Sequence, residues 1–219
     1  KIIEPSASLI SPCTPEVGVE MLQRIENFAR VSHRSEDKQN LASWRRFLQF
    51  VVMEHGDWSV VAHQSATVQF RVDRGVLFEL TRHRLFSFTA ESTRFVNYQK
   101  RGEMEFVVPE GLSQNSLVFA DWKISMDQAE ASYLNMLTNG FPPQTARSVL
   151  PDALASTIVV TGNLRNWRLF FLMRTSRETH PDFRRVTIPL LAEFKKTIPI
   201  FYNDIEPGAR QIDNLSKPR

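Results

Sequence analysis

An alternation of apolar and polar side chains over residues 65–72 limits the fold of this chain more than any other feature. This period of two predicts a strand with one buried face. Its apolar positions are Ala66, Val68, Phe70 and Val72. A compact apolar segment at 156–161 predicts a second strand, and residues 105–108 predict a short third one. Because a half-buried sheet needs other elements to cover it, the chain has to place further structure against these strands.

Apolar residues at helical spacing fill most of the remaining chain. The expected helices cover residues 15–30, 40–56, 76–84, 115–139, 143–147, 163–174 and 181–198. The second of these has Asn40 as its cap and ends at Gly56. Since helices outnumber strands and do not alternate regularly with them, we predict the α+β class rather than a doubly wound α/β fold. With no repeat or linker, residues 1–219 are expected to form one domain, a central antiparallel or mixed sheet flanked by helices.

Composition and motif content exclude several classes of protein and site. Hydrophobic residues make up 42% and charged residues 23% of the 219 residues, as in an ordinary globular protein. The only cysteine is Cys13, so we expect no disulfide, no cysteine-rich zinc site and a reduced, cytoplasmic setting. Glycine-rich phosphate loops, HExxH, GxSxG, a signal peptide and a long apolar run are missing. We therefore predict no metal site and no membrane partner.

Arginine dominates the basic residues of the chain. There are 20 Arg and 7 Lys, and the formal net charge is +3. A guanidinium group binds phosphate or carboxylate through two parallel hydrogen bonds, which an ammonium group does not do. This bias favours an anionic small molecule over a nucleic acid as the partner.

The densest cluster of such groups lies in residues 82–95. Arg82, His83 and Arg84 are adjacent, and like charges this close repel each other unless an anion or an acidic group lies between them. The same segment adds hydroxyl groups and another guanidinium, in Ser92, Thr93 and Arg94. Together these groups predict a phosphate pocket. On charge alone, a solvated basic turn explains the cluster equally well.

The spacing within this segment resembles the signature of the flavin-dependent thymidylate synthases. That signature is RHR, a Ser three residues later, and then S-x-R-[YF]. It is matched here by Arg82, His83, Arg84, Ser87, Ser92, Arg94 and Phe95. Further segments resemble the family as well, namely ARVS at 29–32, HG at 55–56, TARSVLP at 145–151, GNLRNW at 162–167 and LMRTS at 172–176. The resemblance covers residues 15 to 205.

The resemblance implies a flavin site and a nucleotide site shared among the subunits of an intertwined homotetramer. The residues implied for FAD are Ser32, Ser59, Arg82, His83, Arg84, Leu85, Asn163 and Arg165. Those implied for the pyrimidine nucleotide are Glu79, Ala90, Ser92, Thr93, Arg94, Arg147, Met173 through its backbone, and Arg174. Among all of these, Arg174 and Arg82 are the implied catalytic residues.

The activity that the resemblance implies is the reductive C5 methylation of dUMP to dTMP. Methylenetetrahydrofolate would supply the carbon and NADPH the electrons, with FAD as the cofactor. Arg174 would polarise the uracil ring and make C5 nucleophilic. No cysteine nucleophile is implied, and Cys13 lies outside every matched motif.

Four positions depart from the common family pattern. They are Asp57, Thr89, Ala90 and Phe95. The family commonly has Glu or Gln where this chain has Ala90, beside the sugar hydroxyls, so the smaller side chain leaves room there. This keeps a second function open, methylation of the ribonucleotide UMP, with or without dUMP, in a nucleoside-antibiotic pathway. A third alternative is a non-catalytic homologue that binds nucleotides or nucleic acid. The dispersed positive charges disfavour nucleic acid as its ligand.

Ordinary structural roles are open for several of these residues. Arg165 and Arg168, three residues apart, also fit a solvated helix face, and Glu79 could simply neutralise Arg82 one turn away. The four tryptophans are expected in the core rather than in a base-stacking surface.

Overall fold

The computed structural model describes residues 1–210, and these form two compact units. Unit 1 consists of Lys1–Ser6, Phe70–Arg82 and Phe88–Val159. Unit 2 consists of Ala7–Gln69, His83–Ser87 and the described residues from Val160 onward. Each unit takes its residues from separate stretches of the chain. The single domain expected over residues 1–219 stays a prediction. Its last nine residues, 211–219, lie outside the described residues.

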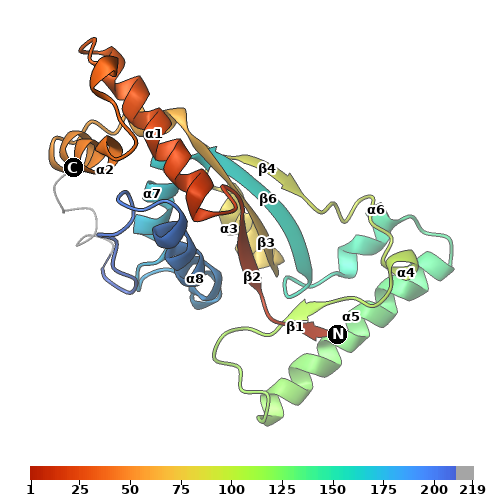
Figure 1. Cartoon of the computed structure of the whole chain (residues 1–219). Helices are drawn as coiled ribbons and strands as arrows, with labels where there is room; N and C mark the ends of the chain where they lie inside the picture. The colour runs from red at the N-terminus through yellow and green to blue at the C-terminus, as the bar shows by residue number, and fades with distance from the viewer. Residues whose placement is uncertain (211–219) are drawn as a thin grey trace. The chain divides into compact units, whose positions relative to one another are not determined.

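Two sheets form from six strands in the described chain (Figure 1). The four-stranded sheet has the order β2-β3-β6-β4, with β2 at Ser6–Ser11, β3 at Ser65–Asp73, β6 at Ala155–Asn163 and β4 at Ser87–Ala90. The two-stranded sheet pairs β1 (Ile2–Ile3) in parallel with β5 (Phe106–Val107), and Ile2 lies opposite Phe106. The expected strands at 65–72 and 156–161 are confirmed, and β6 is longer than predicted.

Strands β3 and β6 run antiparallel. In unit 2 the hydroxyls of Thr67 and Thr161 are hydrogen-bonded at 2.9 Å. In unit 1 Arg71 Nη1 donates to Thr157 Oγ1 at 3.0 Å. Residue numbers rise along β3 as they fall along β6, which is the antiparallel register. The apolar positions of the alternation, Ala66, Val68, Phe70 and Val72, are fully buried, as the period of two predicts.

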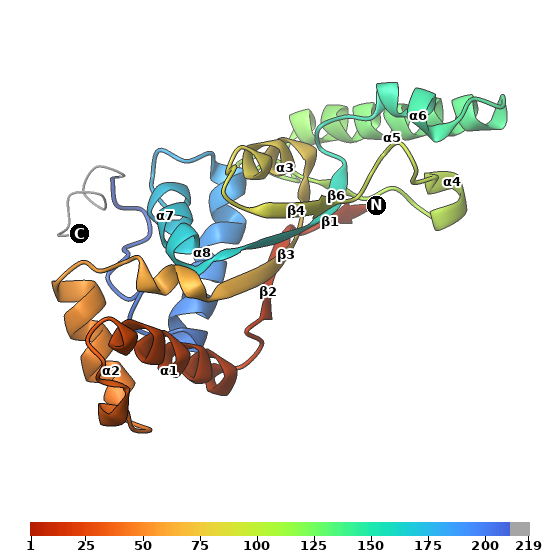
Figure 2. The same cartoon turned by 90° about the horizontal axis from the view of Figure 1, so that it is seen from above.

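Unit 1 has a small apolar core and several helices. They are α3 (Arg74–Thr81), α4 (Tyr98–Arg101), α5 (Leu117–Thr138), α6 (Pro143–Ala146) and the 3-10 turn Arg147–Val149. Helix α5 lies beside α4 and α6 in both views (Figures 1 and 2). The core residues are Tyr98, Met104, Phe106, Tyr133, Ala146 and Leu154. On α5, Leu117, Val118 and Ile124 are exposed, so much of this helix presents apolar side chains to solvent.

The helices of unit 2 enclose an aromatic core. They are α1 (Pro15–Val31), α2 (Ser43–Leu48), the π-helical turns Gln49–Glu54, the 3-10 turns Glu36–Lys38 and Val60–His63, α7 (Leu164–Arg174) and α8 (Pro181–Thr197). The core rings belong to Trp167, Phe170, Phe171, Phe183, Phe194 and Tyr202, all buried. Trp167 Nε1 donates to the Ala66 carbonyl at 3.0 Å, so α7 packs against β3 of the sheet. The observed fold is therefore mixed α+β, with helices covering an antiparallel sheet.

Some sequence-based element bounds were wrong. The second helix begins at Ser43 rather than beside Asn40, whose Oδ1 instead accepts from the Ala42 N–H in a turn, and it continues as π-helical turns to Glu54. Helix α3 begins at Arg74 because Asp73 Oδ1 accepts from the Val76 N–H and caps it. It ends at Thr81, before the adjacent cations. Three short strands, β1, β2 and β4, and the helix α4 were not predicted.

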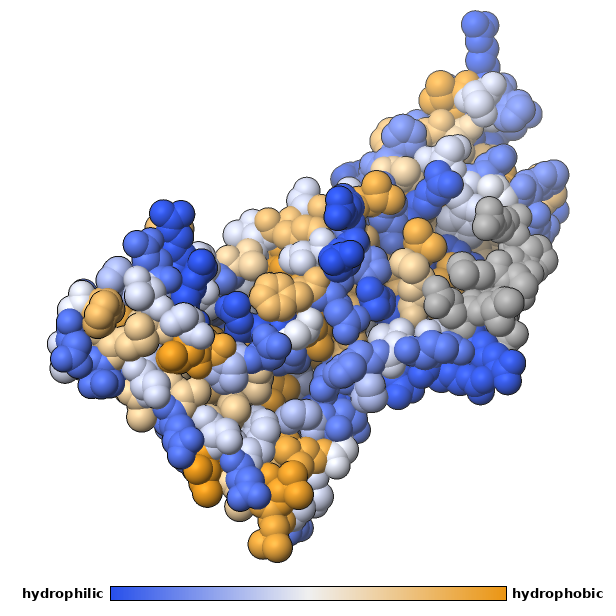
Figure 3. Space-filling model, turned by 180° about the vertical axis from the view of Figure 1, so that it is seen from behind, coloured by the Kyte–Doolittle hydropathy of each residue, from blue (hydrophilic) through white to orange (hydrophobic). Residues whose placement is uncertain are grey.

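Apolar side chains are exposed in separate patches between hydrophilic ones on the face drawn in Figure 3. Among residues 1–210, no helix combines the length and the hydropathy that spanning a membrane requires.

Gly18 on α1 marks the closest approach to α8. A Cβ built on Gly18 would lie 1.8 Å from the backbone oxygen of Thr197, so a methyl group there forces the helices apart. We expect Gly18→Ala to lower the free energy of unfolding by about 2 kcal/mol, the ordinary cost of overpacking. Urea unfolding followed by circular dichroism measures this change. The exposed Glu20→Ala on the same helix is the control, and equal stability of the two variants would contradict the prediction.

Candidate functional site

The segment that carries the adjacent cations follows directly on α3. Arg82 is the C-cap residue of this helix and its side chain is exposed. The next residues form a turn in which the Phe86 N–H donates to the His83 carbonyl at 3.2 Å. Arg82 belongs to unit 1 and His83 to unit 2, so the predicted site residues divide into two groups. Unit 1 holds Glu79, Arg82, Ala90, Ser92, Thr93, Arg94 and Arg147, and unit 2 holds Ser32, Ser59, His83, Arg84, Leu85, Asn163, Arg165, Met173 and Arg174.

His83 and Arg174, 91 residues apart in sequence, are in direct contact in unit 2. Arg174 Nε donates to His83 Nε2 at 2.8 Å. The guanidinium also lies over the ring of Phe183, with its Cζ atom 5.0 Å from the centroid. The His83 ring meets Phe170 edge-on, with centroids 5.0 Å apart. These contacts hold Arg174 in one orientation at the end of α7.

This hydrogen bond requires the neutral form of His83, since Nε2 has to accept. Burial lowers the pKa of His83 to about 4, and the positive charge of Arg174 lowers it further in the same direction. The imidazole therefore stays neutral with Nε2 as its acceptor atom over the physiological pH range.

The lowered pKa makes the stability of the fold depend on pH with a definite sign. An unfolded histidine titrates near its ordinary value of 6.5, while folded His83 titrates near 4. The stability that neutral His83 contributes is complete above roughly pH 6.5 and is lost as the pH falls toward about 4. Comparing the urea midpoints of the wild type and His83→Gln at several pH values in this range measures it. If the wild type did not lose stability relative to the variant on acidification, His83 would not be held neutral.

A cavity of about 170 Å³ adjoins this pair within unit 2. It is lined by His83, Arg84, Leu85, Phe86, Asn166, Leu169, Phe170 and Met173. Most of these side chains are apolar or aromatic, as in sites for ring-shaped ligands. Asn166 Nδ2 donates to the Leu85 carbonyl at 3.0 Å and fixes the turn. The Leu85 side chain is 70% exposed, so one wall of the cavity opens to solvent.

Phe86 occupies a space that only glycine leaves for it. A Cβ on Gly162 of β6 would lie 2.3 Å from Phe86 Cδ1. The Phe86 ring also packs edge-on against Trp167, with centroids 4.8 Å apart. Through these contacts with Gly162 and Trp167, Phe86 anchors the turn that carries His83, Arg84 and Leu85.

The other predicted flavin residues of unit 2 sit at helix ends. Ser32 Oγ donates to the Ala29 carbonyl at the end of α1, and Ser59 precedes the 3-10 turn at 60–63. Asn163 Oδ1 accepts from the Asn166 N–H at 2.8 Å and caps α7, as predicted for the start of this helix. Arg165 is exposed.

The interpretation of Arg165 and Arg168 as one solvated face was wrong for Arg168. Its two terminal nitrogens bind both carboxylate oxygens of Asp204 at 2.7 and 2.6 Å, and its Cζ lies 4.5 Å from the Trp58 ring centroid. The side chain is only 11% exposed, so Arg168 has a structural role.

Unit 1 gathers the predicted phosphate-binding side chains around a turn after β4. The N–H groups of Phe95 and Val96 both donate to the Ser92 carbonyl, which forms the turn. Arg94 Nε donates to Gln144 Oε1 at 3.4 Å. Gln144 on α6 lies three residues before Arg147, which is in the next helical turn. Because residues three apart on a helix are neighbours, the contact with Gln144 brings Arg94 near Arg147.

Arg74 is a cation of this group that the sequence did not single out. Its Nη1 donates to the hydroxyl of buried Thr93 at 3.4 Å, and its Cζ lies 5.3 Å from the Phe78 ring centroid. The sequence did place Arg74 directly after a predicted strand, which could have drawn attention to it. Arg74 lies outside the motif segment 82–95, so the motif spacing did not mark it as a site residue.

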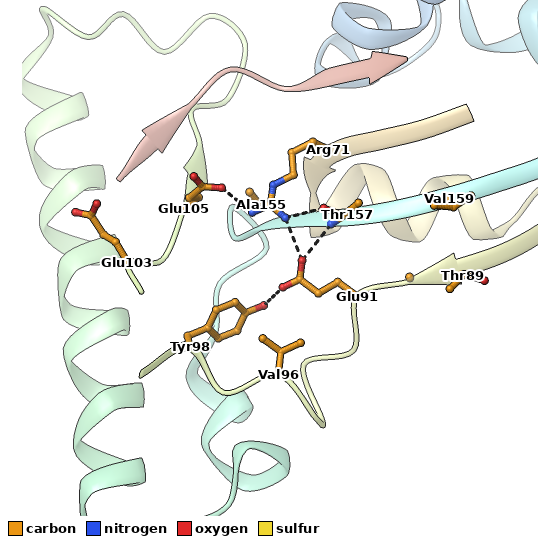
Figure 4. Close-up of a pocket in the computed structure, with 11 residues that line it drawn as sticks. Arg71, Thr89, Glu91, Val96, Tyr98, Glu103, Glu105, Ala155, Thr157 and Val159 are labelled. Carbon is orange, nitrogen blue, oxygen red and sulfur yellow. Dashed lines mark hydrogen bonds and ion pairs between the residues drawn. The ribbon is translucent and has the colours of Figure 1, made fainter. Parts of the chain in front are cut away.

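A second cavity, of about 580 Å³, lies in unit 1 on the polar face of the sheet, beside Thr89 and Ala90 (Figure 4). Arg71 lines this cavity and joins two of its carboxylates: Nη1 donates to Glu91 Oε2 at 3.0 Å and Nη2 donates to Glu105 Oε2 at 2.7 Å. The Tyr98 hydroxyl donates to Glu91 Oε1 at 2.8 Å.

This network was missed at the level of sequence. The alternation of β3 does place Arg71 on the polar face, and Glu91 lies inside the motif segment. Their partners, however, are brought by other elements. Hydrogen bonds from Arg71 lower the pKa of Glu105, while burial and the bond to Glu91 raise the pKa of Tyr98. At neutral pH the cavity is therefore lined by the ionised carboxylate of Glu105 and the neutral phenol of Tyr98.

Among residues 1–210, no three His, Cys, Asp or Glu side chains gather as ligands for a metal ion.

Comparison with known proteins identifies relatives over most of the chain. Residues 19–200 match the Thy1 family model, described as thymidylate synthase complementing protein. The flavin-dependent thymidylate synthase of Corynebacterium efficiens is 33% identical over 200 residues, which cover 83% of this chain and 78% of the relative. That of Corynebacterium glutamicum is 34% identical over 207 residues, covering 86% and 81%.

A solved structure shares the fold. The crystal structure of the UMP/dUMP methylase PolB from Streptomyces cacaoi, bound with 5-Br dUMP, superimposes with a TM-score of 0.74. It covers 92% of this chain and 95% of PolB, at 22% identity. At that identity the likeness establishes the fold, and the family model and the relatives from Corynebacterium establish the ancestry. The RHR turn, its partner Arg174 and the turn after β4 all lie within the matched residues, and the chain belongs to the Thy1 family of enzymes.

Proposed function

We propose that this enzyme catalyses the flavin-dependent, reductive C5 methylation of dUMP, giving dTMP. Methylenetetrahydrofolate is the carbon donor and NADPH is the reductant. The observation that carries the proposal is the contact between His83 and Arg174, because it fixes a guanidinium beside an apolar, ring-sized cavity. The names of the relatives from Corynebacterium support the same chemistry.

The nucleotide phosphate binds at the turn after β4. Arg94 and Arg147 supply positive charge, and Ser92 supplies a hydroxyl donor. Buried Thr93 is hydrogen-bonded to Arg74, which orients that guanidinium toward the same turn. Glu79 on α3 and the backbone of Met173 are the remaining groups that we assign to the nucleotide.

Arg174 acts on the uracil ring. A guanidinium beside a uracil carbonyl stabilises the negative charge that develops when C5 becomes nucleophilic. His83 accepts from Nε, which leaves the orientation of the guanidinium fixed before substrate binds. Cys13 is exposed near the N-terminus and takes no part in this scheme.

The cavity of unit 2 fits one end of a flavin. Its apolar walls suit a ring system, and Arg84 and Asn166 add polar groups at its rim. Ser32, Ser59, Asn163 and Arg165 would hold the rest of FAD together with Arg82, His83 and Leu85. When bound, the flavin supplies the redox chemistry and the handling of the one-carbon unit, which no side chain of this chain can supply.

A homotetramer completes the two sites. Leu85, Arg165, Ser32 and Ser59 are all exposed in the single chain, which suits residues whose ligand lies against a second subunit. The exposed apolar side chains of α5 would be covered by the same assembly. Light scattering of the purified protein, combined with flavin stoichiometry, tests this. A monomer that binds flavin at full stoichiometry would contradict it.

Methylation of UMP is the second candidate function, favoured by the cavity beside Ala90. A cavity of about 580 Å³ has room for an extra hydroxyl, and an open pocket leaves that hydroxyl in contact with water. We expect the wild type to accept UMP, discriminating against it by less than about 10³-fold in kcat/KM. Ala90→Glu should increase this discrimination, because the larger side chain fills the sugar end.

Turnover with dUMP and UMP side by side measures the effect of position 90. Ala90→Leu is the matched control, since it adds bulk without a carboxylate and separates size from polarity. Discrimination above about 10³-fold in the wild type, unchanged by Ala90→Glu, would mean that position 90 does not select the sugar.

Flavin content gives the simplest test of the proposed function. The purified protein should be yellow and should release FAD on denaturation. A colourless protein that takes up no added FAD would contradict the proposal. Binding to duplex DNA with a steep salt dependence would instead support the nucleic-acid alternative.

A further inference from the structure

The carboxylate of Glu91 accepts three hydrogen bonds in the large cavity of unit 1. Its Oε1 accepts from the Tyr98 hydroxyl at 2.8 Å, and its Oε2 accepts from Arg71 Nη1 at 3.0 Å and from the Thr157 N–H at 3.4 Å. The backbone N–H of Glu91 also donates to the Thr157 carbonyl at 2.8 Å. In Figure 4 the carboxylate lies between the guanidinium of Arg71 and the ring of Tyr98. Both the backbone and the side chain of Glu91 are therefore fixed.

Glu91 retains capacity to accept a further hydrogen bond. A carboxylate has about four lone-pair sites, and these three donors use three of them. The second site of Oε1 remains for a ligand in the cavity. Because the pKa of Tyr98 is raised, its hydroxyl stays protonated and continues to donate to Glu91 at neutral and mildly alkaline pH.

The charge of the cavity selects ligands that donate hydrogen bonds. Its ionisable lining is Arg71, Glu91, Glu103 and Glu105, a formal charge of +1 − 3 = −2 apart from the phenol of Tyr98. Both terminal nitrogens of Arg71 are already paired with carboxylates. Such a pocket repels phosphate and accepts a neutral group that carries hydroxyl donors.

The position of the cavity along the chain matches the sugar of a bound nucleotide. Thr89 and Ala90 line it, and Ser92 and Arg94 of the phosphate turn follow at once. Two residues of extended chain span about 7 Å, the scale of a nucleoside monophosphate from its phosphate to its sugar hydroxyls. The phosphate at the turn and the sugar beside Glu91 can therefore belong to one molecule.

We propose that Glu91, held in place by Tyr98 and Arg71, accepts a hydrogen bond from the ribose 2′-hydroxyl and thereby makes UMP a good ligand of this enzyme. The inference rests on the proposed function, because it takes the nucleotide site as given. Deoxyribose has no 2′-hydroxyl, so dUMP does not depend on this contact. Glu91 is then a specificity-determining residue, and Tyr98 and Arg71 are positioning residues.

The experiment compares UMP and dUMP in the flavin-loaded enzyme, by kcat/KM and by calorimetric Kd. We expect Glu91→Gln to lower kcat/KM for UMP and raise its Kd by about 10- to 100-fold, the range for loss of a hydrogen bond to a charged acceptor. The same two quantities for dUMP should change by less than about threefold. Tyr98→Phe should shift the UMP-to-dUMP ratio in the same direction by a smaller factor, since Glu91 keeps its charge and loses only its orientation. Glu103→Gln, at the exposed rim of the same cavity, is the matched control and should leave the ratio unchanged.

The outcomes separate this inference from the proposed function. If neither nucleotide is methylated, the proposed function fails, while the Kd values still report on Glu91. The inference is overturned if Glu91→Gln has an unaltered unfolding midpoint and leaves the ratio of kcat/KM for UMP to that for dUMP unchanged. An equal loss of binding for both nucleotides is such a result. Should Glu91→Gln fail to fold, an unchanged ratio in Tyr98→Phe overturns it equally.

Discussion

Replacing Arg174 with alanine is expected to lower kcat for nucleotide methylation by about 10²- to 10³-fold, the range for losing one preorganised group that stabilises transition-state charge. The guanidinium is held at the end of α7 by His83 and by the ring of Phe183, so in the proposed mechanism it would meet the uracil without reorganisation. Because the charge it stabilises develops only during the reaction, most of the loss falls on kcat rather than on KM.

Steady-state kinetics of Arg174→Ala and of Arg174→Lys measure this effect. Lysine keeps the positive charge but has no planar guanidinium, so it cannot donate to His83 and to the uracil at the same time. Arg174→Lys should therefore be only slightly more active than Arg174→Ala. Arg177→Ala, three residues further along and exposed, is the control for the loss of one positive charge in this region. Full activity in Arg174→Ala would remove Arg174 from the chemistry.

Arg94→Ala is expected to weaken productive binding of the nucleotide, lowering kcat/KM by about 30- to 1000-fold, which corresponds to roughly 2 to 4 kcal/mol. Arg94 lies on an exposed turn beside Gln144, in the neighbourhood of Arg147, and its guanidinium is suited to binding two phosphate oxygens at once.

Comparison of dUMP with deoxyuridine isolates the phosphate contribution. The dephosphorylated nucleoside cannot use Arg94, so kcat/KM for deoxyuridine should change little in Arg94→Ala while that for dUMP falls. Arg24→Ala, an exposed arginine in a surface ion pair on α1, is the matched control. Equal losses for the nucleoside and the nucleotide would show that Arg94 supports the fold of the turn instead of the phosphate.

The sequence was sufficient for the long elements and for the motif. The alternation in β3 and the start of α7 at Asn163 are local signals, and local geometry is enough to produce them. Strands β1 and β4 have two and four residues, too few for a period to be visible, and β2 has six residues of which only Leu9 is buried. Pairing with distant parts of the chain makes these segments strands. The π-helical turns after Leu48 were hidden because their apolar spacing still reads as an ordinary helix.

Pairings between distant residues account for what the sequence left open in the candidate site. The contact of His83 with Arg174 spans 91 residues, and that of Arg71 with Thr157 spans 86. Spacing within a motif says which residue types occur together, but only the fold brings such partners within hydrogen-bond distance. The motif therefore indicated the chemistry, while the acceptor for Arg174 and the network around Glu91 required the structure.

Formation of a methylated nucleotide by the purified enzyme tests the central claim most directly. The assay supplies dUMP, methylenetetrahydrofolate, NADPH and FAD, and mass spectrometry follows the nucleotide in the wild type and in Cys13→Ser. We predict a product heavier by one CH₂ unit that requires both FAD and NADPH and forms equally fast in the serine variant. A product that forms without flavin, or a folded Cys13→Ser variant that is inactive, would contradict the account.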